Sequence, residues 1–239
     1  MADEGNYSAG CLQESKELSN FASMNVGQVI ATLSAGGAIF LVGCGVETPE
    51  TPATYSNMVT YVSGDSLPGR SVFELQELND SPVIRITPAW TAPSSLKTGT
   101  RLMATYRTDG SEVELLALQQ AYTDTVRRAD RVRQGSDTLW LQSMWRTGNY
   151  LNIDCKLAYT ASPRSFTLVL DPATAADSVP TLRVSHWMPD TATVSTDYRR
   201  RVYASCHIAE LWKSDRCRGV KVTFVDINTG LREMTFRKN

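Results

Sequence analysis

Histidine is scarce in this sequence and the net charge is almost zero. Both features exclude certain classes of site and partner. The chain has 2 histidines among 239 residues. A His-based metal or acid–base centre needs several groups that converge on one point, so we expect no metal site and no cofactor. The 24 Lys and Arg residues nearly balance the 25 Asp and Glu residues, which gives a formal charge of −1. Because nucleic-acid-binding proteins usually carry a basic excess, we expect no nucleic-acid partner.

The composition is otherwise that of an ordinary globular protein. Hydrophobic residues make up 42% of the chain and charged residues 21%. These proportions exclude a fibrous repeat, a wholly disordered chain and a polytopic membrane protein. A length of 239 residues suits one large domain or two small ones, with a sizeable buried core.

An uncharged, mostly apolar stretch runs from Val26 to Cys44. It ends in Leu41-Val42-Gly43-Cys44, which resembles the bacterial lipobox, the cleavage pattern whose cysteine becomes lipidated. The Glu- and Pro-containing residues that follow are typical of a tether rather than of a core. We therefore predict a signal peptide over 1–43, a tether over 44–54 and a lipid anchor on Cys44. A signal peptide and a lipid anchor together imply a lipoprotein of the bacterial cell envelope, and we expect it in the outer membrane.

The residues before the apolar stretch depart from the usual signal peptide, which begins with a positive region. Before Met24 the only base is Lys16, against four acidic residues. One explanation is that translation begins at Met24 and that residues 1–23 are an extension. The alternative is that 26–43 forms a buried helix of the fold. A Pro-containing tether directly after it leaves such a helix no apolar partner nearby, which favours the signal peptide.

Beyond Cys44 the apolar residues recur at every second position, as in half-buried strands of an antiparallel sheet. One segment places its apolar side chains at Leu151, Ile153, Cys155 and Leu157. The same period occurs in 202–208 and 220–224, and turn-forming residues separate these segments. Several short strands at this spacing predict an antiparallel β-sandwich over 139–239.

An earlier group of five short apolar segments lies within 55–122. Five strands in about 70 residues suit a small, closed or half-closed OB-like β-barrel. Between the two groups, residues 123–138 are rich in Arg, Asp and Thr, and this composition predicts an exposed linker. The sequence therefore predicts an all-β protein of two domains.

Short motifs within both groups resemble the NigD-like lipoproteins of Gram-negative gut and oral bacteria. The motifs are Gly148-Asn149-Tyr150-Leu151-Asn152-Ile153, Gly99-Thr100-Arg101-Leu102 before a Tyr-bearing strand, and Tyr198-Arg199-Arg200 before another strand. The resemblance covers about residues 55–239 and includes the lipobox. It implies an N-terminal OB-like domain and a C-terminal β-sandwich. No general activity is established for the family, and it supplies no catalytic residues.

One motif points to catalysis. Gly64-Asp65-Ser66-Leu67 matches the nucleophile block of GDSL esterases, in which a late Asp-x-x-His supplies the base. Neither histidine is preceded by such an Asp, because Arg183 stands three residues before His186 and Ala204 three before His207. A polar Gly-Asp-Ser-Leu-Pro-Gly segment is also ordinary turn chemistry, so the esterase is a distant alternative.

Cysteines and tryptophans each allow a structural and a functional interpretation. Cys206 and Cys217 can form a disulfide in an oxidising envelope, or each can be a small apolar core residue. Four tryptophans can stack on sugar rings or fill the core and the domain interface. These four are Trp140, Trp145, Trp187 and Trp212.

The sequence as a whole favours a non-catalytic, NigD-like envelope lipoprotein that binds a protein partner. A glycan-binding accessory lipoprotein, resting on the tryptophans, is the alternative. A GDSL-type esterase is the third reading.

Overall fold

Strands form nearly all of the regular structure in the part of the chain that the computed structural model describes. That part comprises residues 52–64, 68–132, 135–136, 138–189, 191–195 and 197–238, and it belongs to one compact unit, Glu50–Asn239. The predicted signal peptide and the lipid anchor on Cys44 lie outside the described residues. The all-β class that the sequence predicts is confirmed.

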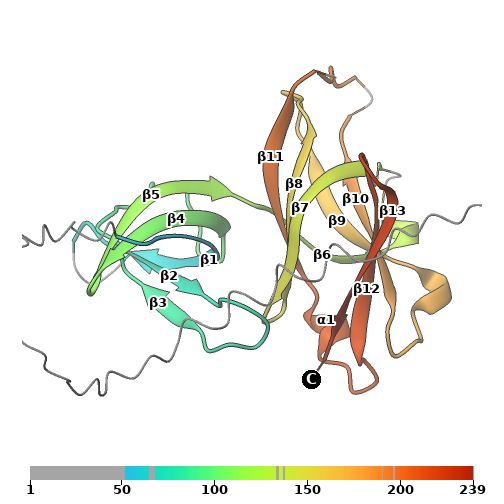
Figure 1. Ribbon diagram of the computed structural model, residues 1–239, viewed down its shortest axis with the longest axis horizontal. Coiled ribbons are helices and arrows are strands. Elements are labelled where there is room, and N and C mark those ends of the chain that lie inside the picture. Colours follow the sequence, from blue (N-terminus) through green and yellow to red (C-terminus); the bar gives the residue numbers. More distant parts are fainter. Residues whose placement is uncertain are drawn as a thin grey trace, which may run out of the picture. The chain divides into compact units, whose positions relative to one another are not determined.

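The first five strands form one antiparallel sheet in the order β3-β2-β1-β4-β5 (Figure 1). The strands are β1 (Thr54–Gly64), β2 (Ser71–Leu75), β3 (Ile84–Ile86), β4 (Arg101–Asp109) and β5 (Glu112–Gln120). This is the strand order of an OB-like barrel, and its edge strands β3 and β5 do not pair with each other in the described residues. The first domain therefore has the expected topology in its open form.

The remaining strands form a mixed sheet in the order β10-β9-β6-β11-β8-β7-β12-β13. They are β6 (Tyr122–Arg128), β7 (Thr138–Thr147), β8 (Tyr150–Ala158), β9 (Ser165–Leu170), β10 (Thr181–Trp187), β11 (Arg199–His207), β12 (Gly219–Asp226) and β13 (Gly230–Arg237). A parallel pairing of β10 with β12 closes seven of these strands into a ring, and β13 pairs only with β12, outside the ring. Short helical turns occupy Ala129–Arg131 (η2), Pro172–Thr174 (η3) and Ala209–Trp212 (α1).

Two expectations about this second domain require correction. The predicted antiparallel sandwich over 139–239 is instead a closed barrel, because four strand pairings are parallel and join segments far apart in sequence. The first part of the predicted linker over 123–138 is strand up to residue 128, because β6 pairs with both β11 and β9. The side chains of Tyr122 and Val126 pack against the barrel core. The domain boundary therefore lies at Ala121, between β5 and β6.

The barrel interior is filled by the alternating apolar residues that the sequence predicts. Leu151, Ile153, Cys155 and Leu157 of β8 are all buried in one cluster. The intervening residues of β8 are polar, yet Asn152 and Asp154 are also buried. Asp154 accepts two hydrogen bonds from Arg201 of the neighbouring strand β11. Strand β8 is therefore covered on both faces, and its polar face is not open to solvent.

Arg101 of β4 supplies the cover over Asn152. This side chain is only 5% exposed. Its guanidinium donates to Oδ1 of Asn152 at 3.2 Å and to Oγ of Ser205 at 3.0 Å, both in the barrel. It also donates to Oγ1 of Thr60 at 2.8 Å within the first sheet, and it lies 4.3 Å from the centre of the Tyr150 ring. Its acceptors are therefore neutral, and its burial lowers the pKa of Arg101 to about 10.

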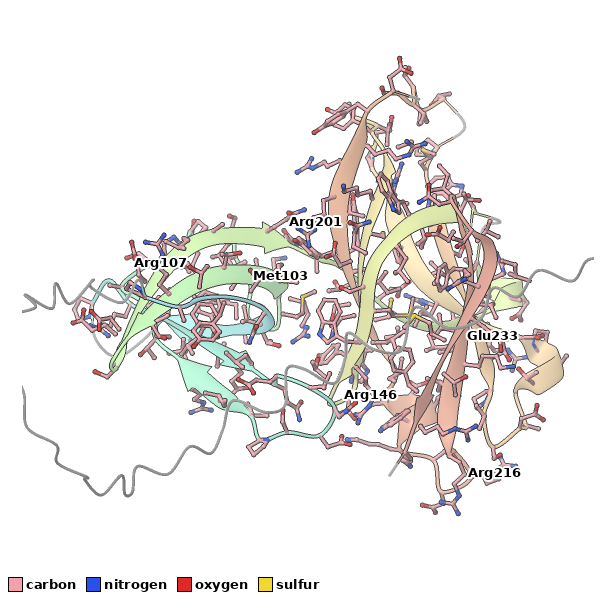
Figure 2. All side chains as sticks on the ribbon, viewed as in Figure 1. Met103, Arg107, Arg146, Arg201, Arg216 and Glu233 are labelled. Carbon is pink, nitrogen blue, oxygen red and sulfur yellow. The ribbon has the colours of Figure 1, made fainter. Side chains whose placement is uncertain are left out.

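A second contact joins the β2–β3 connection to the hairpin between β7 and β8. Arg146, labelled in Figure 2, has a side chain that is 3% exposed and donates to both carboxylate oxygens of Asp80 at 2.8 and 2.6 Å. The backbone N–H of Asn79 donates to the carbonyl of Arg146 at 2.8 Å. Gly148 turns the hairpin with a φ of 52°, and Gln76 fills the space where a Cβ would stand. The turn therefore requires glycine both for its backbone and for this contact.

Apolar side chains complete the contact between sheet and barrel. The buried members of this cluster are Met58, Met103, Ala121 and Tyr203, and Trp145 packs against them. The cluster combines residues of β1 and β4 with residues of β7 and β11. Polar anchors and an apolar cluster both cross the boundary, which agrees with the sheet and the barrel forming one compact unit.

The two faces of β8 differ in their tolerance of charge. We expect Ile153→Asp to lower the free energy of unfolding by about 3–5 kcal/mol, because it buries a carboxylate in the apolar interior. Asn152→Asp places its carboxylate against the buried guanidinium of Arg101, so we expect it to keep at least the wild-type stability near neutral pH. Urea unfolding of both variants measures the difference. Equal destabilisation of the two would show that Arg101 does not stabilise a charge at this position.

The Asp80–Arg146 pair predicts a pH-dependent stability. The hydrogen bond from Arg146 holds the pKa of Asp80 below its ordinary value. The stabilisation is therefore complete above the unfolded-state pKa of about 4 and is lost as the pH falls through the lower folded-state pKa. We expect Asp80→Asn to cost about 1–3 kcal/mol near neutral pH, since Arg146 is buried while Asp80 is 70% exposed.

A matched control is Glu74→Gln, which breaks the exposed Glu74–Arg85 pair. We expect this change to cost less than about 1 kcal/mol, because water solvates both groups once the pair is broken. The measurement is urea unfolding of wild type and both variants over a range of acidic to neutral pH. A constant gap between wild type and Asp80→Asn down to the lowest pH would contradict the pairing.

Candidate functional site

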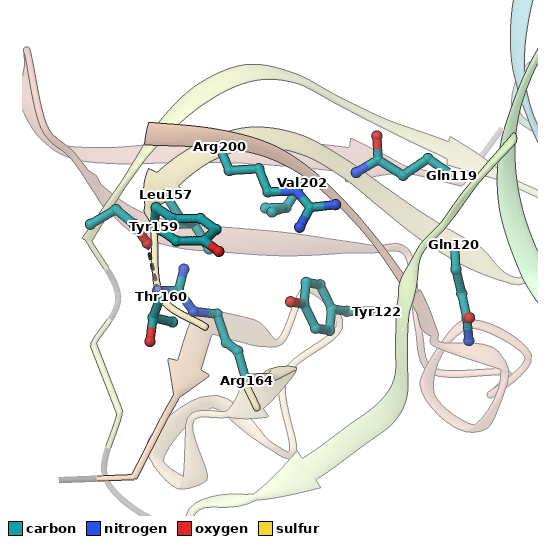
Figure 3. A pocket seen from close by; sticks show the side chains of 10 residues that line it. Gln119, Gln120, Tyr122, Leu157, Tyr159, Thr160, Arg164, Arg200 and Val202 are labelled. Carbon is teal, nitrogen blue, oxygen red and sulfur yellow. Dashed lines mark hydrogen bonds between the residues drawn. The ribbon is translucent and has the colours of Figure 1, made fainter. Parts of the chain in front are cut away.

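A cavity of about 200 Å³ lies where β8 ends and where β6 and β11 begin. Figure 3 shows the side chains around it. Its wall combines the end of β5 with four segments of the barrel. The lining residues are Gln119, Gln120, Tyr122, Leu157, Ala158, Tyr159, Thr160, Arg164, Arg200 and Val202. The described residues of this lining contain two guanidinium groups and three hydroxyl groups, but no Asp or Glu.

Strand pairing determines which residues reach the cavity. In the antiparallel ladder of β8 and β11, Leu157 stands opposite Arg200. Gln119 of β5 donates from Nε2 to the carbonyl of Arg201 at 3.2 Å, which fixes the end of β5 against β11. After β5 ends at Gln120, Ala121 connects it to Tyr122, which is the first residue of β6. The cavity therefore depends on the first sheet as well as on the barrel.

Arg164 is the half-buried cation of the site. Its Nη2 donates to the carbonyl of Ala158 at 2.9 Å and lies 3.7 Å from Sδ of Met188. Its Nε is buried and has no hydrogen-bond partner among the described residues. Burial lowers the pKa of Arg164 from its ordinary value, but an arginine side chain still keeps its charge at neutral pH. The site thus holds a partly desolvated positive charge.

Two exposed tyrosines form the rim beside the cavity. Tyr159 is 39% exposed and Tyr198 is 59% exposed. Their rings meet edge to face, with centroids 5.6 Å apart. The backbone N–H of Tyr159 donates to the carbonyl of Tyr198 at 2.9 Å, which extends the pairing of β8 and β11 beyond the barrel. The two rings therefore contact each other, and a hydrogen bond joins the backbone of the residues that carry them.

The four tryptophans that the sequence singles out do not gather at this site. Trp212 is 5% exposed and its ring is covered by the guanidinium of Arg146, so it is unavailable for stacking on a sugar. Trp140 has the ammonium of Lys156 above its ring at 4.5 Å. Trp145 packs against the cluster between sheet and barrel. Trp187 lines two other surface hollows. None of the four is among the described residues that line the cavity.

The disulfide between Cys206 and Cys217, one of the two interpretations that the sequence left open, is not formed. Cys206 and Cys217 are both free and buried. Cys206 lies in the barrel core on β11, where burial raises the pKa of its thiol to about 12. The thiol of Cys217 donates to the carbonyl of Gly219 at 3.3 Å. Both residues therefore serve as small core residues, the alternative that the strand pattern of Cys206 indicated.

The esterase motif cannot be placed. Gly64 is the last residue of β1, whereas Asp65, Ser66 and Leu67 lie outside the described residues. His186 is buried, and its Nε2 is hydrogen-bonded with the carbonyl oxygen of Thr138 at 2.8 Å. The ring of His207 meets the ring of Tyr150 edge to face.

Sequence reasoning missed most of this site. Tyr122, Tyr159 and Arg164 carry no motif, and they come together only through barrel closure and the segments at its end. Arg200 belongs to an Arg-rich run in the sequence, which by itself is typical of a solvated surface. The site is identified by two arginines, Arg164 and Arg200, in one cavity whose described lining has no acidic residue. Only the tertiary structure brings these two arginines together.

Metal-binding clusters and membrane-spanning helices are both missing from the described part of the chain. No group of three or more His, Cys, Asp or Glu side chains there is arranged to hold a metal ion. No helix among the same residues is long and apolar enough to cross a membrane.

Solved structures with this fold exist, although no family model and no curated protein matches the sequence. A NigD-like immunity protein from Bacteroides caccae aligns with a TM-score of 0.56 at 16% identity, over 79% of this chain and 99% of that one. A toxin-related protein from Parabacteroides distasonis aligns with a TM-score of 0.57 at 16% identity, over 78% and 94%. A protein of unknown function, DUF1344, from Bacteroides vulgatus gives 0.56 at 14%, over 78% and 92%.

At these identities the similarity shows the fold alone. The structural neighbours include a NigD-like protein, as the sequence motifs predicted. The alignments span both the open sheet and the barrel, because they cover more than three quarters of the chain.

Proposed function

We propose that this protein is a non-catalytic lipoprotein of the cell envelope that binds a protein partner at the end of its barrel. The observation that carries the proposal is the cluster of Tyr159, Tyr198 and Arg200 beside a cavity. Tyrosine and arginine are enriched among the residues that dominate protein–protein binding energy. Here they lie together on a surface that backbone pairing holds in place, so little conformational entropy is lost on binding.

The names of two structural neighbours support a protein partner. One is described as a NigD-like immunity protein and another as toxin-related. These descriptions belong to those proteins and serve here only as an analogy. We propose by analogy that this chain also acts through binding rather than through turnover.

The chemistry of the site agrees with a binding role. Its lining offers cations and hydroxyl groups, but no histidine or carboxylate that could serve as a general base. A glycan partner is less well supported, because the rings of Trp140 and Trp212 are each covered by a cation. The rings of Tyr159 and Tyr198 meet edge to face and do not form the flat platform that a sugar ring uses.

The proposed location in the cell envelope depends on the sequence Leu41-Val42-Gly43-Cys44. We expect Cys44 to carry the lipid anchor, which would hold the binding surface near the membrane by the tether that follows. Metabolic labelling with a clickable fatty acid should mark the wild type and leave Cys44→Ser unmarked. Equal labelling of the two proteins would show that Cys44 does not carry the lipid.

Site-specific cross-linking tests the partner surface. A photo-reactive amino acid at position 198, introduced in the native cells, should give a discrete adduct that a protease digests. The control position is Leu231 on β13, which is 76% exposed and outside the site, and it should give no such adduct. Adducts of the same size and yield from both positions would refute the assignment of this surface. An adduct that resists proteases but not glycosidases would identify a glycan partner instead.

A further inference from the structure

We infer that the cavity between Arg164 and Arg200 binds a carboxylate, contributed by an acidic side chain of the partner protein. The inference deepens the proposed function and rests on it, because it names the group that the partner inserts beside the tyrosine rim. No sequence motif points to this cavity as a site.

The charge balance of the cavity differs from that of two other described hollows that contain arginine. Each of those two has an acidic residue in its wall, Asp124 in one and Glu210 in the other. Arg127 is bonded to Asp124 at 2.6 Å in one of them, and Arg128 contacts Asp130 at 3.4 Å beside another. No acidic residue is among the described residues that line the cavity between Arg164 and Arg200. Its two positive charges therefore have no counter-ion in this lining.

The donors are directed into the same space. Figure 3 shows the guanidinium groups of Arg164 and Arg200 and the hydroxyl groups of Tyr122 and Tyr159 around one hollow. Nε of Arg164 is closed to solvent and has no hydrogen-bond partner among the described residues, so it does not serve the hollow. The donors open to a ligand are the remaining N–H groups of the two guanidinium groups. Arginine pairs best with planar, two-oxygen acids, and such charge-assisted bonds are about twice as strong as neutral ones.

The volume of the cavity limits the size of the ligand group that can enter it. Sites that enclose a whole small-molecule ligand usually measure roughly 300–1,000 Å³, whereas this cavity measures about 200 Å³. It is therefore suited to a small group such as one acidic side chain and not to a drug-sized ligand. The exposed rings of Tyr159 and Tyr198 at its edge offer apolar contact to the residues that flank the inserted acid.

Titration with a minimal probe tests the inference without any partner. The 239-residue chain is prepared with Cys44→Ser in every sample and titrated with N-acetyl-glutamate N-methylamide. The signals of the arginine Nε–H groups are followed by NMR. We expect saturable binding that shifts the Nε–H signal of Arg164, and we expect the neutral glutamine analogue to bind at least about tenfold more weakly, as loss of a charge-assisted bond implies.

Arg200→Gln is the decisive variant, because Arg200 is exposed and its loss leaves no core contact unfilled. We expect it to weaken the probe at least about fivefold, and we expect Arg199→Gln, on the adjacent exposed residue outside the cavity, to change the affinity less than about twofold. Equal binding of the charged and neutral probes, or an unchanged affinity in Arg200→Gln, would overturn the inference. Tighter binding of inorganic phosphate or of glucuronate than of the glutamate probe would overturn it too, in favour of a phosphorylated or glycan ligand.

The cross-linking experiment separates this inference from the proposed function. If the probe does not bind while position 198 still gives its protein adduct, the carboxylate site is wrong and the partner surface stands. If the probe binds while position 198 gives no adduct, the partner surface is wrong and the cavity serves a free acid. If both succeed, Arg200→Gln should also lower the yield of the adduct, whereas Arg199→Gln should not.

Discussion

Burial of Arg101 between the open sheet and the barrel is the constraint on which the rest of this structure depends. A buried cation without a carboxylate is costly unless every donor finds an acceptor. Here the acceptors come from both domains, Thr60 on one side and Asn152 and Ser205 on the other. A shift of the sheet along the barrel would leave the guanidinium unpaired. The interaction therefore specifies one arrangement of the two domains more than it adds stability.

The candidate site is a consequence of that arrangement. Its wall takes Gln119 and Gln120 from the first sheet and the remaining residues from the barrel or its loops. Arg201 and Arg200 are neighbours on β11 with opposite roles. Arg201 is neutralised by Asp154, whereas Arg200 faces a cavity without an acid. Alternation along one strand thus separates a structural arginine from one that is available to a ligand.

The sequence predicted those parts of the fold that depend on local pattern. The period of two in β8 identified Leu151, Ile153, Cys155 and Leu157 as core residues. The same pattern could not show that Asn152 is buried, because its cover comes from Arg101, 51 positions away in the chain. Nor could it identify β6 as a strand of the barrel, since Tyr122 and Val126 give little apolar signal among Arg, Asp and Thr. Parallel pairing with β11 and β9 makes that segment a strand.

By itself, the sequence determined the all-β class, the division into two strand groups, the interior face of β8 and the resemblance to NigD-like lipoproteins. These properties follow from side-chain alternation and short motifs, which act between near neighbours along the chain. Tertiary structure alone decided that the second group closes into a barrel, that Cys206 and Cys217 remain apart as free thiols, and that Arg164 and Arg200 share a cavity. These outcomes depend on non-local hydrogen bonding and on the balance of charge within a buried space. No local pattern encodes either of them.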